Sequence, residues 1–404
     1  MDIYEQLGVK KRINGAGLVT RLGGSLMPPE VLEAMVEAAS AFVDMTELQA
    51  RASALIAEAT GAEAGLVTTG AAAALTLGTA ACLTGLDAAR MDRLPDTSGM
   101  PHVVVMARPH RNAYDHAIRA AGARLREVGL NDRAVGAGVR GVEPWEWEAA
   151  LDADVVAIAY TATPLMEPPL REVAEVAHRR GLPVLVDAAA ALPPLARLRR
   201  LLADGADLVA VSGGKALRGP QSTGILCGRR DLIAAAALQQ LDMDVAPETW
   251  RPPAALVPRD RLSGIPHHGI GRGFKAGKEE IVGLLVALRR FVTVDHEAEA
   301  ARATRCLESL AGRLAGLPHV ATRLRSAAET GRYPWLEVVL DERGLGQTAA
   351  SVSRALQDGD PPVHLGERRA TEGVLIVHPE GLRDGDEVVV GARLAGVLGA
   401  SPKS

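Results

Sequence analysis

Short apolar runs recur between about residue 65 and residue 227, and each run ends in turn-forming or polar residues. Their length and their valine, leucine and isoleucine content are typical of buried strands. The longer segments between them have helical spacing, and this alternation predicts an α/β fold with a mostly parallel sheet. We expect strands at 65–69, 102–106, 123–128, 155–160, 184–187, 208–211 and 224–227.

Changes in this pattern along the chain predict three parts. We expect an N-terminal arm over residues 1–45, a large α/β domain over 46–275 and a small α+β domain over 276–404. The stretch 242–268 is rich in proline and has few periodic apolar residues, so we expect an extended loop there. Shorter strand-like runs in the small domain lie at 320–324, 335–340, 363–365 and 374–377.

Lys215 lies in a glycine-rich stretch, Ser-Gly-Gly-Lys-Ala-Leu-Arg-Gly-Pro-Gln (212–221), directly after the apolar run 208–211. A lysine that forms a Schiff base needs a strand end that fixes its direction and neighbours without bulk, and this stretch provides both. A solvated lysine in a surface turn is the alternative interpretation. Lys215 is therefore a candidate catalytic residue.

Asp187 ends the strand expected at 184–187, and small residues follow it. The interval of 28 residues (215 minus 187) between Asp187 and Lys215 is long enough for one crossover helix between two parallel strands. In pyridoxal phosphate enzymes, a carboxylate beside the pyridine nitrogen keeps that nitrogen protonated. An acid and a lysine at the ends of two strands fit this role.

A third element lies upstream, where the strand expected at 65–69 runs through Thr68-Thr69-Gly70 into an alanine-rich helix. The N-terminus of a helix offers unpaired backbone N–H groups and the positive end of the helix dipole, which together suit a phosphate. Such a turn is common in α/β proteins, so the order of the three elements carries the inference. Phosphate turn, acid-ended strand and lysine turn follow one another as in fold-type-I pyridoxal phosphate enzymes.

Several motifs together resemble one family. They are Thr-Thr-Gly-Ala-Ala (68–72), Val-Asp-Ala-Ala-Ala (186–190), the lysine stretch 212–221 and Gly-Arg-Gly-Phe-Lys-Ala-Gly-Lys (271–278), with Arg-Ile-Asn-Gly-Ala-Gly (12–17) near the start. The chain resembles the selenocysteine synthase-like (SelA-like) group, which includes D-glucosaminate-6-phosphate ammonia-lyases, over nearly its whole length. The resemblance implies an aspartate aminotransferase-like fold of type I with a smaller α+β C-terminal domain.

The resemblance also implies roles for individual residues. Lys215 would form the Schiff base with pyridoxal 5'-phosphate and Asp187 would pair with the pyridine nitrogen. His110 would lie over the face of the cofactor ring, with Tyr114 as the rival and a backbone-bonded loop histidine as the alternative. The residues expected at the phosphate are Thr69, Gly70, Ala71 and Ser212.

Cationic residues near two loops are candidates for substrate binding. Arg272 and Lys275 precede a helix expected from about residue 279, where the helix dipole disfavours positive charge, and this conflict indicates an anionic ligand. Arginine can bind a carboxylate or phosphate through two hydrogen bonds. Arg21 resembles part of an N-terminal loop that reaches over such sites, or else it pins that segment structurally.

Adjacent histidines, His267 and His268, do not indicate a metal site. Two successive side chains diverge, and no cysteine or carboxylate nearby in the sequence completes a recognisable ligand spacing. We expect no metal. Either histidine is a candidate general acid or base.

Composition and charge argue against nucleic-acid-binding and membrane proteins. With 404 residues, 48% hydrophobic content and a net charge of −4, the chain can bury a large core and has no strongly basic block for nucleic acid. The family's core begins within the first dozen residues, which argues against a tRNA substrate. Three scattered cysteines (Cys82, Cys227, Cys306) and no apolar run of membrane-spanning length predict a cytoplasmic protein without membrane attachment.

These observations lead to one functional prediction. We expect a pyridoxal phosphate-dependent lyase that takes the α-proton from an amino acid or amino sugar acid, eliminates the β-substituent and releases ammonia and a 2-keto acid. The alternatives are a β-replacement transferase, a racemase, an aldol-type lyase, or a cofactor-binding assembly protein without turnover. We also expect a homodimer or a higher homo-oligomer.

Overall fold

The computed structural model describes residues 2–130, 142–163 and 167–399. The chain divides into a large unit, Met27–Thr293, and a small unit, Met1–Leu26 together with Val294–Ser404. The expected boundaries at 45 and 275 both fall within the large unit. The reason is that α2 (Pro29–Ala39) and α3 (Met45–Thr60) pack against α11 (Lys278–Thr293), which joins both flanking segments to the sheet domain.

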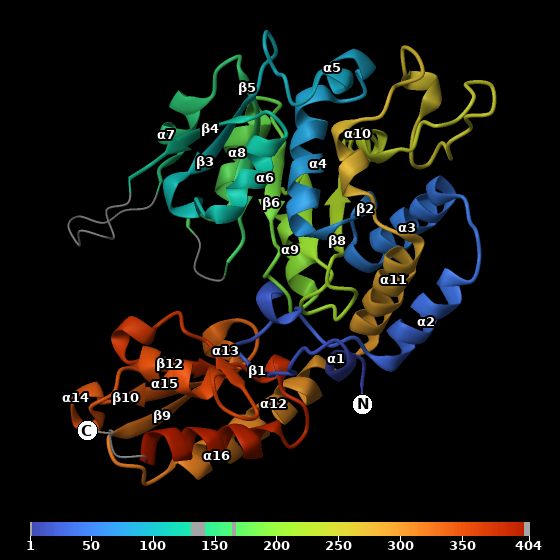
Figure 1. The fold of residues 1–404 in the computed structure, drawn as a ribbon. Helices are drawn as coiled ribbons and strands as arrows, with labels where there is room; N and C mark the ends of the chain where they lie inside the picture. Colours follow the sequence, from blue (N-terminus) through green and yellow to red (C-terminus); the bar gives the residue numbers. More distant parts are fainter. Residues whose placement is uncertain (1, 131–141, 164–166, 400–404) are drawn as a thin grey trace. The chain divides into compact units, whose positions relative to one another are not determined.

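A seven-stranded sheet forms the centre of the large unit (Figure 1). Its order is β2-β8-β7-β6-β5-β3-β4, and every neighbouring pair is parallel except the two that involve β8. The mostly parallel sheet expected from the sequence is confirmed. The strands are β2 (Ala64–Thr68), β3 (Val103–Ala107), β4 (Arg124–Val128), β5 (Val155–Thr161), β6 (Val184–Asp187), β7 (Leu208–Ser212) and β8 (Gly224–Gly228).

Helices alternate with these strands along the chain. They are α4 (Gly70–Thr84), α5 (Ala88–Arg93), α6 (His116–Ala120), α7 (Pro144–Ala150), α8 (Leu170–Arg179), α9 (Ala196–Ala203) and α10 (Arg230–Gln240). Short 3-10 turns include η2 (Arg108–His110), η3 (Ala113–Asp115), η5 (Arg259–Arg261) and η6 (Ile270–Phe274). The crossover between β6 and β7 holds α9, as the interval between Asp187 and Lys215 predicts.

The alanine-rich helix α4 is buried on nearly all sides, and Figure 1 shows it between α6 and α10. It lies against β6, β7 and β8, where a Cβ at Gly78 would be 3.0 Å from Leu185 and 3.4 Å from Leu208 and Leu226. Small side chains therefore allow the helix to approach the sheet closely, as dense core packing requires. This contact fixes the direction in which the N-terminus of α4 points.

The small unit contains the strands expected in the C-terminal part. Its antiparallel sheet has the order β12-β10-β9, and β1 of the N-terminal segment pairs in parallel with β11. The strands are β1 (Ile13–Gly15), β9 (Val320–Arg325), β10 (Trp335–Leu340), β11 (Val363–Leu365) and β12 (Val374–Val377). The helices and turns are α1 (Ile3–Gln6), η1 (Thr20–Leu22), α12 (His296–Leu314), α13 (Ala327–Thr330), α14 (Glu342–Leu345), α15 (Ala349–Gln357), η7 (Ala370–Glu372), η8 (Pro379–Gly381) and α16 (Asp386–Gly399).

Glu380 is a buried acid of the small unit, in η8 next to β1. Its side chain is 6% exposed, and its Oε2, without a hydrogen-bond partner among the described residues, lies 3.8 Å from Nδ1 of His378. Burial raises the pKa of Glu380 to about 7, against a smaller opposing effect of Arg332, and burial lowers the pKa of His378 to about 4. The Glu380 carboxyl and the His378 ring are therefore both neutral between about pH 4 and about pH 7.

We predict that Glu380→Gln stabilises the small unit in alkaline solution. The folded-state pKa of about 7 lies above the ordinary 4.5, so wild-type stability is fully present below pH 4.5 and falls as the pH rises toward 7. The loss is roughly 3 kcal/mol at most. In thermal unfolding, the Tm of Glu380→Gln should therefore lie above that of wild type at about pH 8. The difference in Tm should shrink toward pH 4.5.

Glu308→Gln, at an exposed position of α12, is the matched control and should follow the wild-type pH dependence. An identical pH dependence of unfolding in wild type and Glu380→Gln would contradict the assignment.

Candidate active site

Three polar residues end neighbouring parallel strands at one edge of the sheet. Thr161 ends β5, Asp187 ends β6 and Ser212 ends β7, and Thr161 pairs with Asp187 in the register of the two strands. Because the carboxyl ends of parallel strands meet at one edge, their side chains gather there. Ligands bind at this edge in open α/β sheets.

The structure places Asp187 and Lys215 within electrostatic range of each other. Asp187 pairs with Ala210 across β6 and β7, and Lys215 follows three residues after β7 ends. Burial raises the pKa of Asp187, while the hydrogen bond from the backbone N–H of Ala189 (3.0 Å) and the positive charge of Lys215 oppose that rise. Lys215 is half-buried. The acid and the amine predicted from the sequence therefore share one site.

A tight turn holds Lys215 in place. The N–H of Gly213 donates to the carbonyl of Thr223 (2.8 Å), and a Cβ at Gly214 would lie 2.4 Å from Cα of Gln221. Arg218 has a φ of +59°, a conformation that costs a non-glycine residue about 1 kcal/mol or more. The glycines are needed because the returning chain passes directly against the lysine turn.

The phosphate turn expected at Thr69–Ala71 joins β2 to α4. Gly70 has a φ of +87°, and Thr69 caps α4 without a side-chain hydrogen bond to its first turn. The Thr69 hydroxyl instead donates to the carbonyl of Phe274 (3.0 Å). Gly70 and Ala71 are half-exposed, so the first-turn N–H groups of a 15-residue helix are open to an anion.

His110 lies in η2 after β3 and is fully buried. Its Nε2 lies 3.1 Å from the carbonyl of Glu167, its Nδ1 lies 3.5 Å from the backbone N of Thr161, and its ring packs edge-on against Tyr160 at 4.6 Å. Burial lowers the pKa of His110 to about 4, so the ring is neutral. Stacking on a cofactor stays a prediction, and it requires the ring to be uncovered. Tyr114, the rival, is 65% exposed in η3.

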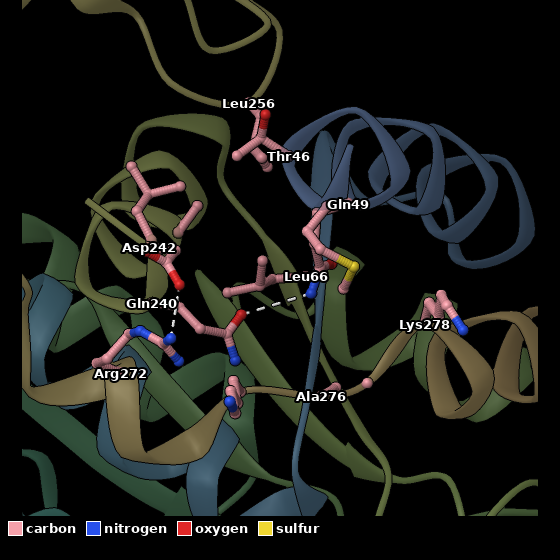
Figure 2. A pocket seen from close by; sticks show the side chains of 14 residues that line it. Thr46, Gln49, Leu66, Gln240, Asp242, Leu256, Arg272, Ala276 and Lys278 are labelled. Atoms are coloured by element: carbon pink, nitrogen blue, oxygen red, sulfur yellow. Dashed lines mark hydrogen bonds and ion pairs between the residues drawn. The ribbon is translucent and has the colours of Figure 1, made fainter. Parts of the chain in front are cut away.

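A pocket of about 310 Å³ lies beside the loop that holds Arg272 and Ala276 (Figure 2). Arg272, Lys275 and Lys278 line it together with apolar side chains, and Nη2 of Arg272 lies 2.6 Å from Oδ2 of Asp242. Phe274 links this pocket to the phosphate turn, because its carbonyl accepts from Thr69 and from Nε2 of Gln240 (2.8 Å). Lys215, Asp187 and His110 do not line it.

Arg21 and Ser212, which were predicted to bind substrate and cofactor phosphate, do not line this pocket. Arg21 belongs to the small unit, where its Nη1 lies 3.3 Å from Nδ1 of His364 and its Nη2 lies 3.8 Å from Glu367. Ser212 is half-buried at the end of β7. No described contact tests the binding roles expected for Arg21 and Ser212.

The histidine pair diverges as expected, but carboxylates are near both side chains. Nδ1 of His267 lies 2.9 Å from Asp92, and Nε2 of His268 lies 3.6 Å from Asp242 and 3.8 Å from Asp244. The possible ligand atoms of Asp242, Asp244 and His268 lie within 4.8 Å of one another, and all three residues are exposed. The fold brings together residues that are too far apart in the sequence to form a recognisable metal motif.

Two further positions at the site, Thr161 and Gly224, were not predicted from the sequence. Thr161 holds His110 through a hydroxyl that donates to the His110 carbonyl (3.1 Å), and it lies beside Asp187. Gly224, at the start of β8, lies so close to the phosphate turn that a Cβ there would be 2.4 Å from the carbonyl carbon of Gly70. A polar residue after the apolar run 155–160 was the available signal for Thr161. The sequence carries none for Gly224.

A half-buried acid within electrostatic range of a lysine, an uncapped helix N-terminus and a mostly parallel sheet define an enzyme of the fold-type-I pyridoxal phosphate class. Comparison with known proteins agrees, because the family of class-V aminotransferases matches residues 23–333. The chain belongs to this family. The resemblance found in the sequence is thereby confirmed, and so is pyridoxal 5'-phosphate as the cofactor of the family.

Relatives match nearly the whole chain. A 5'-C-glycyluridine monooxygenase-decarboxylase of Streptomyces sp is 33% identical over 399 residues, which is 96% of this chain and 90% of the relative. A D-glucosaminate-6-phosphate ammonia lyase of Salmonella typhimurium is 32% identical over 402 residues, 97% of each chain. An L-seryl-tRNA(Sec) selenium transferase of Nitratidesulfovibrio vulgaris is 26% identical over 401 residues, 88% of this chain and 75% of the relative.

A solved structure of a D-glucosaminate-6-phosphate ammonia-lyase has the same fold. It matches with a TM-score of 0.80 and 30% sequence identity, and the alignment covers 100% of both chains. The expected fold class is therefore confirmed. Among the described residues, no helix is both long enough and apolar enough to cross a lipid bilayer.

The side chains present fit the cofactor. Asp187 would pair with the pyridine nitrogen, the amine of Lys215 would bind the aldehyde carbon, and the backbone N–H groups at the start of α4 would hold the phosphate. Positive charge on the pyridine nitrogen would offset the effect of burial on the pKa of Asp187.

We predict that Gly224→Ala weakens cofactor binding without unfolding the protein. The new Cβ would lie 2.4 Å from the carbonyl carbon of Gly70 and 2.7 Å from the backbone N of Ala71, so the phosphate turn has to shift. The dissociation constant for pyridoxal phosphate, measured by titrating the cofactor-free protein and recording visible absorbance, should rise at least about tenfold.

Gly264→Ala is the control, because a Cβ there meets nothing within 4 Å. It should bind the cofactor as wild type does. Wild-type affinity in a folded Gly224→Ala protein would argue against this turn as the phosphate site.

Proposed function

We propose that this protein is a pyridoxal phosphate-dependent lyase that acts on an amino acid or amino sugar acid. It removes the α-proton, eliminates a β-hydroxyl as water and releases ammonia and a 2-keto acid. The water lost in elimination is regained when the product is hydrolysed, so the net change is substrate to keto acid plus ammonia. The observation that carries the proposal is that Lys215 and Asp187, both half-buried, lie within electrostatic range of each other.

Lys215 is the proposed base. When bound, the cofactor supplies an electron-accepting ring that stabilises negative charge at the substrate α-carbon. The Nζ of Lys215, which lies in a half-buried turn, takes the α-proton from the substrate. Asp187 holds a proton on the pyridine nitrogen, and the N–H group of Ala189 fixes the carboxylate orientation.

A small-molecule substrate with an anionic group is supported by the cations of the 272–278 loop. Arg272 uses one nitrogen for Asp242 and has further N–H donors, and Lys275 is exposed at the same pocket. The Phe274 carbonyl ties this loop to the phosphate turn. We propose that Arg272 and Lys275 bind a carboxylate or phosphate of the substrate.

The choice of a lyase is supported by the Salmonella relative, whose name specifies an ammonia lyase and which matches 97% of this chain. A second candidate is an oxygen-consuming decarboxylase, since the Streptomyces relative is equally similar. The two reactions share α-carbon activation and differ in what leaves: ammonia without oxygen consumption, or carbon dioxide with it.

Free thiols support a reducing compartment for this enzyme. Cys82, Cys227 and Cys306 form no disulfide, and burial raises the pKa of Cys82 and of Cys227 to about 12. Unpaired cysteines are usual in the cytoplasm, where we propose the enzyme works.

We predict that a screen of 3-hydroxy amino acids and amino sugar acids finds a substrate that yields ammonia and a 2-keto acid in equal amounts, with no oxygen uptake. Lys215→Ala should lower that rate by at least about 1,000-fold because the base is lost. Lys10→Ala, at an exposed position of the small unit, is the control. Oxygen uptake with carbon dioxide release would favour the second candidate, and a retained rate in Lys215→Ala would reject both.

We predict that Arg272→Gln raises the KM for this substrate at least about tenfold, with a smaller effect on kcat, because charge-assisted hydrogen bonds to an anionic group are lost. Arg261→Gln, an exposed arginine of η5 that does not line the pocket, should leave KM unchanged. An unchanged KM in Arg272→Gln would show that the anionic group of the substrate binds to other residues.

A further inference from the structure

A second pocket of the large unit lies where the end of β5 meets α8 and α9. Its volume is about 610 Å³, within the range of roughly 300–1,000 Å³ that is typical of sites for small molecules. Among the described residues that line it, none is Lys215, Asp187 or Arg272. The candidate active site therefore does not use this pocket.

Three arginines line this second pocket, and we name it the arginine pocket after them. Arg171 lies in the first turn of α8, Arg197 lies in the first turn of α9, and Arg200 follows three residues later on the same face of α9. Nη2 of Arg171 lies 3.0 Å from Oδ1 of Asp204, and Nε of Arg200 lies 3.3 Å from Oδ2 of the same residue. One carboxylate thus holds two guanidinium groups at the pocket, and both groups have further N–H donors.

Positive charge exceeds negative charge in the arginine pocket. Its walls carry three arginines and two carboxylates, those of Glu172 and Asp204. α8 and α9 both begin here without a side-chain cap, so the positive ends of two helix dipoles add to the excess. Arg171 and Arg197, each in a first helical turn, are unfavourable there unless an anion offsets them. The charges of this pocket therefore favour an anionic ligand.

β5 separates the arginine pocket from the candidate active site. Tyr160 lines the pocket, whereas the next residue, Thr161, pairs with Asp187 and donates to the carbonyl of His110. Successive side chains of a strand point to opposite faces of the sheet. The ring of Tyr160 lies edge-on against the ring of His110 at 4.6 Å, so it forms a wall between the two sites. A molecule in the arginine pocket would therefore be separate from the reacting substrate.

We propose that the arginine pocket binds the phosphate group of a small molecule other than the reacting substrate. Arginine presents a planar fork of N–H groups that matches the geometry of phosphate oxygens. A phosphate group offers three acceptor oxygens, so it can bond with arginines of both helices at once, whereas a carboxylate has only two oxygens. The rest of the pocket holds the organic part of the ligand. The inference rests on a cavity and its charges and is independent of the proposed reaction.

The test is isothermal titration calorimetry of the protein saturated with pyridoxal phosphate, with inorganic pyrophosphate as the probe at low ionic strength. Wild type should bind pyrophosphate at a saturable site. Arg171→Gln and Arg200→Gln should each raise the dissociation constant at least about tenfold, because a guanidinium donor is lost and the charge of Asp204 is less compensated. Both arginines are exposed, so circular dichroism should show wild-type folding.

Arg180→Gln is the matched control, because Arg180 is exposed at the opposite end of α8 and its replacement removes the same charge. This variant should bind pyrophosphate as wild type does. No binding to wild type, or wild-type affinity in both pocket variants, would overturn the proposal. A site that is lost in Arg272→Gln and retained in Arg171→Gln would place the anion at the 272–278 loop, which would also overturn it.

Two further comparisons test the kind of ligand. Succinate, which has carboxylates in place of phosphates, should bind at least about tenfold more weakly than pyrophosphate. Equal affinity for the two probes would contradict a phosphate site. In turnover assays, pyrophosphate should not compete with the substrate through this pocket. Competition that disappears in Arg171→Gln would show that the occupant is part of the substrate, against the proposal of a second molecule.

Discussion

The parallel pairing of β6 with β7 is the constraint on which the candidate site depends. It sets Asp187 opposite Ala210, so the lysine turn that follows β7 begins beside the acid. Apart from their last residues, Asp187 and Ser212, the two strands are runs of buried aliphatic residues. A register slip of one residue would turn every side chain to the opposite face and separate the acid from the amine.

A second constraint acts on the phosphate turn. α4 is held against the sheet by small residues, and Gly224 of β8 lies almost in contact with the carbonyl carbon of Gly70. β8 pairs with both β2 and β7. It therefore helps to position both the phosphate turn, which follows β2, and the lysine turn, which follows β7. Cofactor phosphate and cofactor aldehyde would thus be positioned by one rigid element.

The sequence predicts the parts of the site that depend on local pattern. Asp187 and Lys215 are predictable because each follows an apolar run whose length identifies a buried strand. The other strands of both units, except β1 in the expected N-terminal arm, are predictable for the same reason. The unit boundaries are not, because they depend on the packing of α2 and α3 against α11, contacts between segments more than 200 residues apart.

Properties that depend on tertiary contacts also cannot be predicted from the sequence. His110 follows a strand as expected, but its complete burial against Tyr160 and Glu167 is set by another strand and loop. Arg272 shares Asp242 with His268, a grouping that no spacing in the sequence reveals. The close approach of Gly224 to the phosphate turn likewise cannot be predicted before the fold is known.

The proposed chemistry requires that the cofactor binds covalently to Lys215 beside Asp187. The most direct test is borohydride reduction of the protein loaded with pyridoxal phosphate, followed by peptide mapping of the pyridoxyl adduct. Reduction should remove the visible absorption band and leave a single modified peptide that contains Lys215. A pyridoxyl group on another lysine, or no adduct in a protein that is folded and saturated with cofactor, would contradict it.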